Sequence, residues 1–133
     1  MAKTSTICPF CGCGCNFYLT TQNNRVVGVE PSPKNPVNKG MLCTKGWNSY
    51  EFIHSPDRLT RPLVRKNGEL TESSWDEALE IVSKKLGEIQ DVHGSSALAF
   101  LSSAKVTNEE NYLFQKMARA VFKTNNVDHC ARL

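Results

Sequence analysis

Cys8-Pro-Phe-Cys-Gly-Cys-Gly-Cys15 is the segment on which the fold of the first part of this chain depends. Three of its cysteines follow a C-x2-C-x3-C spacing, and a fourth cysteine comes after 27 intervening residues; the set is Cys8, Cys11, Cys15 and Cys43. Four soft thiolates, three from one tight loop and one from a distant return of the chain, are the typical ligands of a [4Fe–4S] cluster. The spacing therefore predicts an iron–sulfur cluster and a role in electron transfer.

Other uses of the cysteines remain open at this point. A zinc site with four cysteine ligands is the main alternative, although such sites usually show two C-x2-C pairs, and the second half here offers one cysteine. A disulfide framework is disfavoured, because nothing in the sequence indicates secretion. Cys13 could replace Cys11 or Cys15, but we expect it to be a spare thiol near the cluster. Cys130 is expected to be a small buried hydrophobe.

Composition places the chain among ordinary globular proteins. It has 133 residues, a hydrophobic content of 40% and a net charge of +3, which is too small and too dispersed to indicate nucleic-acid or membrane-surface binding. No apolar run approaches the roughly 18 residues of a membrane span. The N-terminal residues resemble neither a secretory signal nor a twin-arginine signal, so a cytoplasmic location is expected.

Residues 1–57 are rich in Cys, Gly, Asn and Pro and are expected to form a small domain held by its metal. Two strands joined by an Asn-Asn turn, a proline-rich loop and a short helix are predicted, at Asn16–Thr21 and Arg25–Glu30, Pro31–Gly40 and Gly46–Ile53 respectively.

Residues 58–133 are expected to begin a second domain of the α/β class. A hairpin is predicted around Asn67-Gly68, a strand at Ala97–Leu101, and two helices that begin with the capping boxes Ser74/Glu77 and Thr107/Glu110 and end near Val92 and Phe122. The expected core positions are Ala78, Leu79, Val82, Leu86 and Ile89 on the first helix, and Leu113, Met117, Ala120 and Val121 on the second. One strand and two amphipathic helices cannot bury both faces of a sheet, so we expect the chain to be the beginning of a larger protein.

Two further sites are suggested by position. Lys45 lies two residues after Cys43 and must be near the cluster, where an ammonium group can offset cluster charge or bridge to another cofactor. The loop over residues 102–108 follows a strand and opens a helix, which is the usual place for a phosphate or nucleotide. The three histidines have no neighbour that would make a catalytic pair.

Several segments resemble the N-terminus of the molybdopterin oxidoreductases. They are the cysteine segment, Gly-Met-Leu-Cys-Thr-Lys-Gly (40–46), Arg-Pro-Leu-Val (61–64) and Ser-Trp-Asp-Glu-Ala-Leu (74–79). The stretches at 111–121 and 124–133 are similar to the catalytic subunit of formate dehydrogenases. The resemblance covers nearly the whole chain and favours the cluster over zinc.

The resemblance implies the cofactors and the roles of individual residues. It implies a [4Fe–4S] cluster on Cys8, Cys11, Cys15 and Cys43, and molybdenum or tungsten bound by two pterin guanine dinucleotides. Lys45 would relay electrons between the cluster and the pterin. Ser102, Ser103 and Asn108 would lie near the pterin, although Ala104-Lys105-Val106 replaces a more glycine-rich family pattern. It places no catalytic residue in this part of the enzyme.

The same resemblance implies how the protein works. The complete enzyme would interconvert formate and carbon dioxide, with the rest of the catalytic subunit and Fe–S subunits as partners, a hydrogenase module being one candidate, while these 133 residues alone would be inactive. In formate dehydrogenases a metal-binding selenocysteine or cysteine follows the residues that match 130–133. Selenocysteine is encoded by UGA, normally a stop codon, so selenocysteine is expected at position 134, with a trimmed chain or a split subunit as alternatives. A stand-alone Fe–S carrier and the N-terminus of another pterin enzyme, such as a nitrate reductase, are the alternatives.

Overall fold

The computed structural model describes residues 1–130. Their contacts divide the chain into two compact units. Of the described residues, unit 1 combines Met1–Arg58 with Leu101–Phe114 and residues 129–130, and unit 2 combines Leu59–Phe100 with Gln115–Asp128. Short strands and a few helices make up both, so the predicted mixed α/β class is confirmed.

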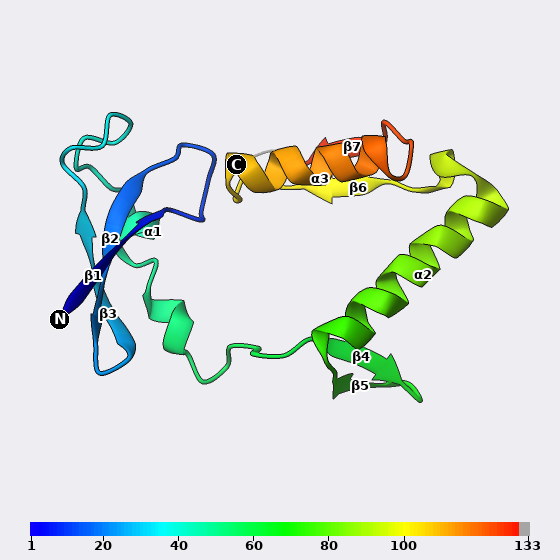
Figure 1. The fold of residues 1–133 in the computed structure, drawn as a ribbon, viewed down its shortest axis with the longest axis horizontal. Coiled ribbons are helices and arrows are strands. Elements are labelled where there is room, and N and C mark those ends of the chain that lie inside the picture. Colours follow the sequence, from blue (N-terminus) through cyan, green and yellow to red (C-terminus); the bar gives the residue numbers. More distant parts are fainter. Residues whose placement is uncertain (131–133) are drawn as a thin grey trace. The chain divides into compact units, whose positions relative to one another are not determined.

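Unit 1 contains an antiparallel sheet of three strands in the order β1-β2-β3 (Figure 1). The strands are β1 (Ala2–Ile7), β2 (Asn16–Gln22) and β3 (Arg25–Pro31). Asn23 and Asn24 join β2 to β3 with φ angles of 49° and 58°, the left-handed conformation that a two-residue hairpin turn requires. This hairpin was predicted, whereas β1 was not, because its mostly polar sequence lacks apolar alternation.

The predicted loop after β3 returns the chain to Cys43, and Asn38 holds it in place. The buried Asn38 side chain accepts a hydrogen bond from the backbone N–H of Asn16 (3.1 Å) and donates to the carbonyl oxygens of Asn16 (3.1 Å) and Met41 (3.0 Å). Asn16 directly follows Cys15 in the sequence. The amide network therefore attaches the chain that leads to Cys43 beside the end of the cysteine loop.

Two short elements replace the single helix predicted over residues 46–53. They are α1 (Thr44–Trp47) and the 3-10 helix η1 (Glu51–His54). His54 attaches the end of η1 to the sheet, because its Nε2 accepts a hydrogen bond from the backbone N–H of Val26 in β3 (2.9 Å).

Unit 2 begins with the predicted hairpin and first long helix. The strands β4 (Leu63–Lys66) and β5 (Glu69–Glu72) pair in antiparallel register around Asn67 and Gly68, whose φ angles are 52° and 89°. Helix α2 (Trp75–His93) starts at Ser74, whose hydroxyl accepts from the backbone N–H of Glu77 (3.1 Å). The helix ends at Gly94, which has a φ of 81°.

A strand–helix–strand segment follows, and its boundaries differ from the prediction. The strand predicted over Ala97–Leu101 starts later, because Ala97 ends the 3-10 helix η2 (Ser95–Ala97), and strand β6 runs over Phe100–Ser102. Helix α3 (Asn108–Ala120) leads to β7 (Val127–His129), which pairs with β6. Three residues are too few to show a periodic pattern, so β7 was not predicted.

The buried apolar residues of unit 2 lie where β6 meets α3. The core there comprises Leu98, Phe100, Ala118 and Phe122, and the rings of Phe100 and Phe122 are 5.2 Å apart. The core face predicted for α3 was wrong, since Leu113, Ala120 and Val121 are exposed and Met117 is half-buried. Helix α2 has no buried residue among the described part of the chain.

Within residues 1–130, the longest helices are too short or too polar to cross a bilayer.

Candidate functional site

The cysteine loop connects β1 to β2 and is closed by a backbone hydrogen bond. The N–H of Cys8 donates to the carbonyl oxygen of Cys15 (2.8 Å), so the first and last cysteines of the segment lie next to each other. Gly14 adopts a φ of 76°, in the left-handed region that favours glycine, immediately before Cys15. The hairpin geometry thereby gathers the three predicted ligands of this segment in one short loop.

Cys43 meets backbone donors at the start of α1. Hydrogen bonds from the N–H groups of Gly46 and Lys45 to its sulfur, together with the positive charge of Lys45, hold the pKa of the Cys43 thiol below its ordinary value. A thiolate is the form that binds iron, so these contacts favour the ligating state.

Cys8 lies within electrostatic reach of cysteines from both segments. Burial raises the pKa of the Cys8 thiol, and the charges of Cys11 and Cys43 raise it further, whereas the Phe10 N–H and the charge of Lys45 oppose this shift. Cys8, Cys11, Cys43 and Lys45 therefore form one electrostatic neighbourhood.

Cys15 belongs to the same neighbourhood. Burial and a sulfur–sulfur contact of 3.6 Å with Cys13 raise the pKa of Cys15 to about 11, and the charges of Cys8 and Cys11 contribute. The exposed Cys13 is thus a thiol beside a predicted ligand, as the sequence suggested.

The donor set fits an iron–sulfur cluster. Four thiolates supplied by two segments are the soft ligands that such clusters use. Among the described residues, no three His, Cys, Asp or Glu side chains converge closely enough to hold a single metal ion. A tetrahedral zinc site would need its sulfur atoms roughly 4 Å apart, given Zn–S bonds of about 2.3 Å. The fit to a cluster therefore rests on the chemistry of the four thiols and on the electrostatic effects that they have on one another.

Apolar groups lie beside the cysteine loop. Phe10 packs edge-on against Phe52, with ring centroids 6.1 Å apart, and the guanidinium of Arg58 lies 4.9 Å from the centre of the Phe52 ring. Ile7 and Pro9, on either side of Cys8, line an apolar cavity of about 180 Å³. These groups keep water from part of the loop, which agrees with the burial of Cys8.

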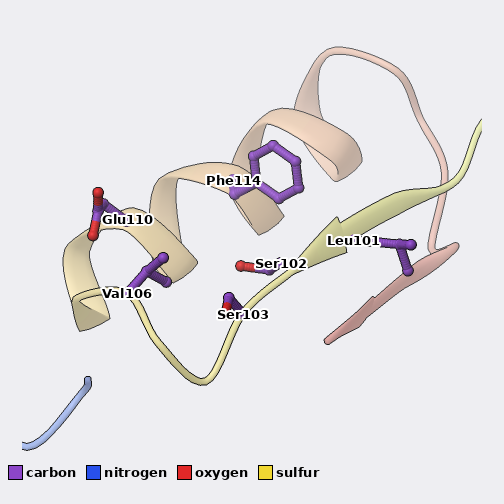
Figure 2. A pocket seen from close by; sticks show the side chains of 6 residues that line it. All are labelled: Leu101, Ser102, Ser103, Val106, Glu110 and Phe114. Atoms are coloured by element: carbon purple, nitrogen blue, oxygen red, sulfur yellow. The ribbon is translucent and has the colours of Figure 1, made fainter. Parts of the chain in front are cut away.

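The loop after β6 borders a second cavity, of about 230 Å³ (Figure 2). Its lining residues are Leu101, Ser102, Ser103, Val106, Glu110 and Phe114. The Ser102 hydroxyl donates to the side-chain oxygen of Asn111, whose amide N–H donates to the Ser103 carbonyl oxygen (3.1 Å). The two predicted serines thus lie at one cavity and are fixed by the same asparagine.

Asn108, the third residue predicted for this loop, turns its side chain toward the cysteine loop. Its amide N–H donates to the carbonyl oxygen of Gly12 (2.7 Å). No sequence pattern indicates this contact, because it joins residues that are 96 positions apart.

Cys130 departs from expectation. It is exposed instead of buried, and its sulfur lies 3.4 Å from the Ser103 hydroxyl oxygen. That hydrogen bond and the N–H of Ala104 lower the pKa of the Cys130 thiol. Residues 131–133, which complete the segment similar to formate dehydrogenases, lie outside the described residues.

Two family models match successive parts of the chain. Residues 1–55 match the molybdopterin oxidoreductase Fe4S4 domain, and residues 58–133 match the molybdopterin oxidoreductase domain. The chain therefore belongs to the molybdopterin oxidoreductase family, whose members combine a [4Fe–4S] cluster with a molybdopterin cofactor.

The chain is also similar to curated proteins of known name. It is 55% identical over 128 residues, 96% of this chain, to the F420-dependent formate dehydrogenase 1 subunit alpha of Methanococcus maripaludis. It is 49% identical over 97% of its length to the corresponding alpha subunit of Methanocaldococcus jannaschii. It is 48% identical over 98% of its length to the putative formate dehydrogenase YrhE of Bacillus subtilis. The chain spans only 18%, 18% and 13% of these relatives.

Proposed function

We propose that the chain is the N-terminal part of the catalytic subunit of a formate dehydrogenase, an enzyme that interconverts formate and carbon dioxide. The observation that carries this proposal is identity of about half over nearly the whole chain to proteins named formate dehydrogenases. These relatives support this function over the alternatives of a stand-alone Fe–S carrier or a nitrate reductase. We expect these 133 residues alone to be inactive.

In this proposal residues 1–57 form the cluster domain, in which Cys8, Cys11, Cys15 and Cys43 hold the [4Fe–4S] cluster. The mutual effect of these thiols on their pKa values, and the backbone donors at Cys43, support this ligand set. Each ligand must lose its proton when iron binds, and the N–H groups around Cys43 stabilise the resulting thiolate.

Lys45 is proposed to lie on the electron path between the cluster and the pterin. Its charge acts on both Cys8 and Cys43, and its side chain is exposed, so the ammonium group is available to a second cofactor. The cluster supplies one-electron transfer, and the molybdenum or tungsten pterin supplies the two-electron chemistry on formate. The chain's own task is to position the cluster and to exclude water from it.

We propose that the pterin lies beside the loop that follows β6, near Ser102, Ser103 and Asn108. The cavity beside Ser102 and Ser103, at the start of a helix, supports this placement. Both serine side chains are already hydrogen-bonded within the chain, so we expect the backbone of the loop to contribute as much as the hydroxyl groups.

The finer features of the proposal follow from the resemblance. We propose Fe–S electron-transfer subunits as partners, with a hydrogenase module as one candidate among them, and a cytoplasmic location for the complex. The choice between molybdenum and tungsten, and the selenocysteine expected at position 134, stay predictions. Metal analysis and mass spectrometry of the purified full-length enzyme test both.

The cysteine variants test the cluster assignment in the full-length protein. Replacing Cys43 by Ser should remove the visible absorbance of the cluster and about four iron atoms per chain, because one of four ligands is lost. The matched variant Cys13→Ser should keep both. Formate-dependent dye reduction by the wild-type enzyme tests the activity separately. Retained absorbance in Cys43→Ser would overturn the ligand set, and a wild-type enzyme loaded with its metals but inert to formate would overturn the function.

A further inference from the structure

One side chain connects the start of α3 to the cysteine loop. The Asn108 amide donates to the carbonyl oxygen of Gly12, and Gly12 lies between Cys11 and Cys13. Both ends of this contact belong to unit 1. A single hydrogen bond therefore ties the loop of predicted ligands to the loop that follows β6.

The contact requires glycine at position 12 for reasons of space. A Cβ atom added to Gly12 would lie 2.5 Å from the Oδ1 atom of Asn108 and 3.3 Å from its Cγ atom. Gly12 is not among the glycines with positive φ, so alanine would fit its backbone conformation. A methyl group at this position would instead push the Asn108 side chain away and break the hydrogen bond.

Asn108 is itself held firmly. The residue before it forms a complete capping box, in which the Thr107 N–H donates to the Glu110 carboxylate (2.7 Å) and the Glu110 N–H donates to the Thr107 hydroxyl (3.2 Å). One turn further on, Asn111 accepts a hydrogen bond from the Ser102 hydroxyl and donates one to the carbonyl oxygen of Ser103. The start of α3 is thus fixed to the end of β6, and Asn108 extends from a rigid base.

We propose that Asn108 is a positioning residue for the cluster. It holds the part of the loop between Cys11 and Cys13 against the start of α3, and so fixes the cluster relative to the loop that follows β6. The proposal rests on the proposed function, since it assumes that Cys11 and its partners carry the cluster. The reduction potential of such a cluster depends on its hydrogen bonds and solvent exposure, and both change if the loop is released.

The test compares Asn108→Ala, Gly12→Ala and the double variant in the full-length protein. Cluster potentials are measured by redox titration followed by electron paramagnetic resonance, with iron per chain measured alongside. Each single variant should keep its iron and shift the cluster potential, because each breaks the same contact. The double variant should shift the potential no further than the larger single shift, because two changes at one contact are not additive.

Gly14→Ala and Asn108→Asp are the controls. Gly14 has a positive φ and nothing within 4 Å of its added Cβ, so alanine there strains the loop without touching Asn108, and its effect should add to that of Asn108→Ala. Asn108→Asp keeps the shape of the side chain but replaces the donor N–H with an acceptor oxygen and adds a negative charge. It should therefore also shift the potential, through the lost contact and the added charge together, whereas Asn108→Ala measures the loss of the contact alone.

Three results would overturn the proposal. The first is a wild-type potential in both Asn108 variants, and the second is a double-variant shift equal to the sum of the two single shifts. If a variant loses iron, the same comparison is made on the iron content per chain. The third result is then an iron loss in the double variant that equals the sum of the losses in the two single variants. A wild-type protein without iron would instead refute the proposed function itself. If the Asn108 variants keep the wild-type potential but Cys43→Ser loses iron, only the role of Asn108 is refuted and the proposed function stands.

Discussion

Cys15 and Cys43 are both predicted ligands, but their surroundings shift the pKa values of their thiols in opposite directions. The Gly46 and Lys45 N–H groups lower the pKa of Cys43, while burial and the Cys13 contact raise that of Cys15 to about 11. At neutral pH a thiol with a lowered pKa has the larger thiolate fraction, and a thiol with a pKa of about 11 stays protonated. In the protein without its cluster, Cys43 therefore loses its proton more readily than Cys15 when iron binds.

This difference predicts the order of alkylation in protein stripped of its cluster. At pH 7.5 Cys43 should react with iodoacetamide faster than Cys15, because the thiolate is the reactive form and Cys43 is also more exposed. Raising the pH toward 11 should speed up Cys15 more than Cys43. Peptide mass spectrometry follows each site, and equal rates throughout would mean that the loop is not formed before iron binds.

Some properties of single residues could be predicted from the sequence, and others could not. The spacing of the cysteines predicts the ligand set Cys8, Cys11, Cys15 and Cys43, and this set stays a prediction. Cys130 was predicted to be buried and is exposed, and its contact with Ser103 joins residues 27 positions apart, which a sequence pattern does not reveal. The contact between Asn108 and Gly12 had no signal in the sequence for the same reason.

Elements with a local chemical cause were predicted well. Asn-Asn and Asn-Gly fixed both hairpins through positive φ angles, and two capping boxes fixed the starts of α2 and α3. Elements that depend on distant partners were missed or displaced. Strand β1 has a polar sequence and exists by pairing with β2, and β7 exists by pairing with β6.

The hydrogen bond that caps α2 should contribute measurably to the stability of this helix. Ser74→Ala should lower the free energy of unfolding of unit 2 by about 1 kcal/mol, because the Glu77 N–H loses its acceptor. Hydrogen exchange of the first turn of α2 in the full-length protein measures this loss. Ser83→Ala is the matched control, since the Ser83 hydroxyl lies within the helix and caps nothing. An equal effect of the two changes would contradict the capping role.

Glu77 joins that helix to the preceding hairpin. Its carboxylate accepts from the Ser73 hydroxyl and pairs with Lys66, and these contacts, that of Lys66 first, lower the pKa of Glu77. A lowered carboxyl pKa stabilises the fold above the ordinary glutamate pKa and loses that effect as the pH falls through the lowered value. The cap and this ion pair therefore act on the same end of α2.

At the scale of the whole molecule, the apolar side of α2 lacks a covering partner among the described residues. Trp75, Leu79, Val82 and Ile89 follow one another at helical spacing and are 67%, 58%, 52% and 37% exposed. Of the predicted core stripe, Leu79, Val82 and Ile89 are therefore exposed among the described residues, whereas Ala78 and Leu86 are half-buried. Because the chain spans 13% to 18% of its relatives, we expect the remainder of the complete protein to cover this side.

Val82→Lys tests that expectation in the full-length protein. If Val82 is buried there, the charged side chain should lower the free energy of unfolding by more than about 1 kcal/mol, since burying a valine contributes about 1.5 kcal/mol or more and a buried ammonium group is costly. Glu80→Lys, an exposed change on the same helix, should leave the unfolding temperature nearly unchanged. In the isolated residues 1–133 the apolar side of α2 should be exposed, so the result should differ. There Val82→Lys should reduce the binding of a hydrophobic dye without loss of helix. Equal unfolding temperatures for the two full-length variants would show that the apolar side of α2 stays exposed in the complete protein.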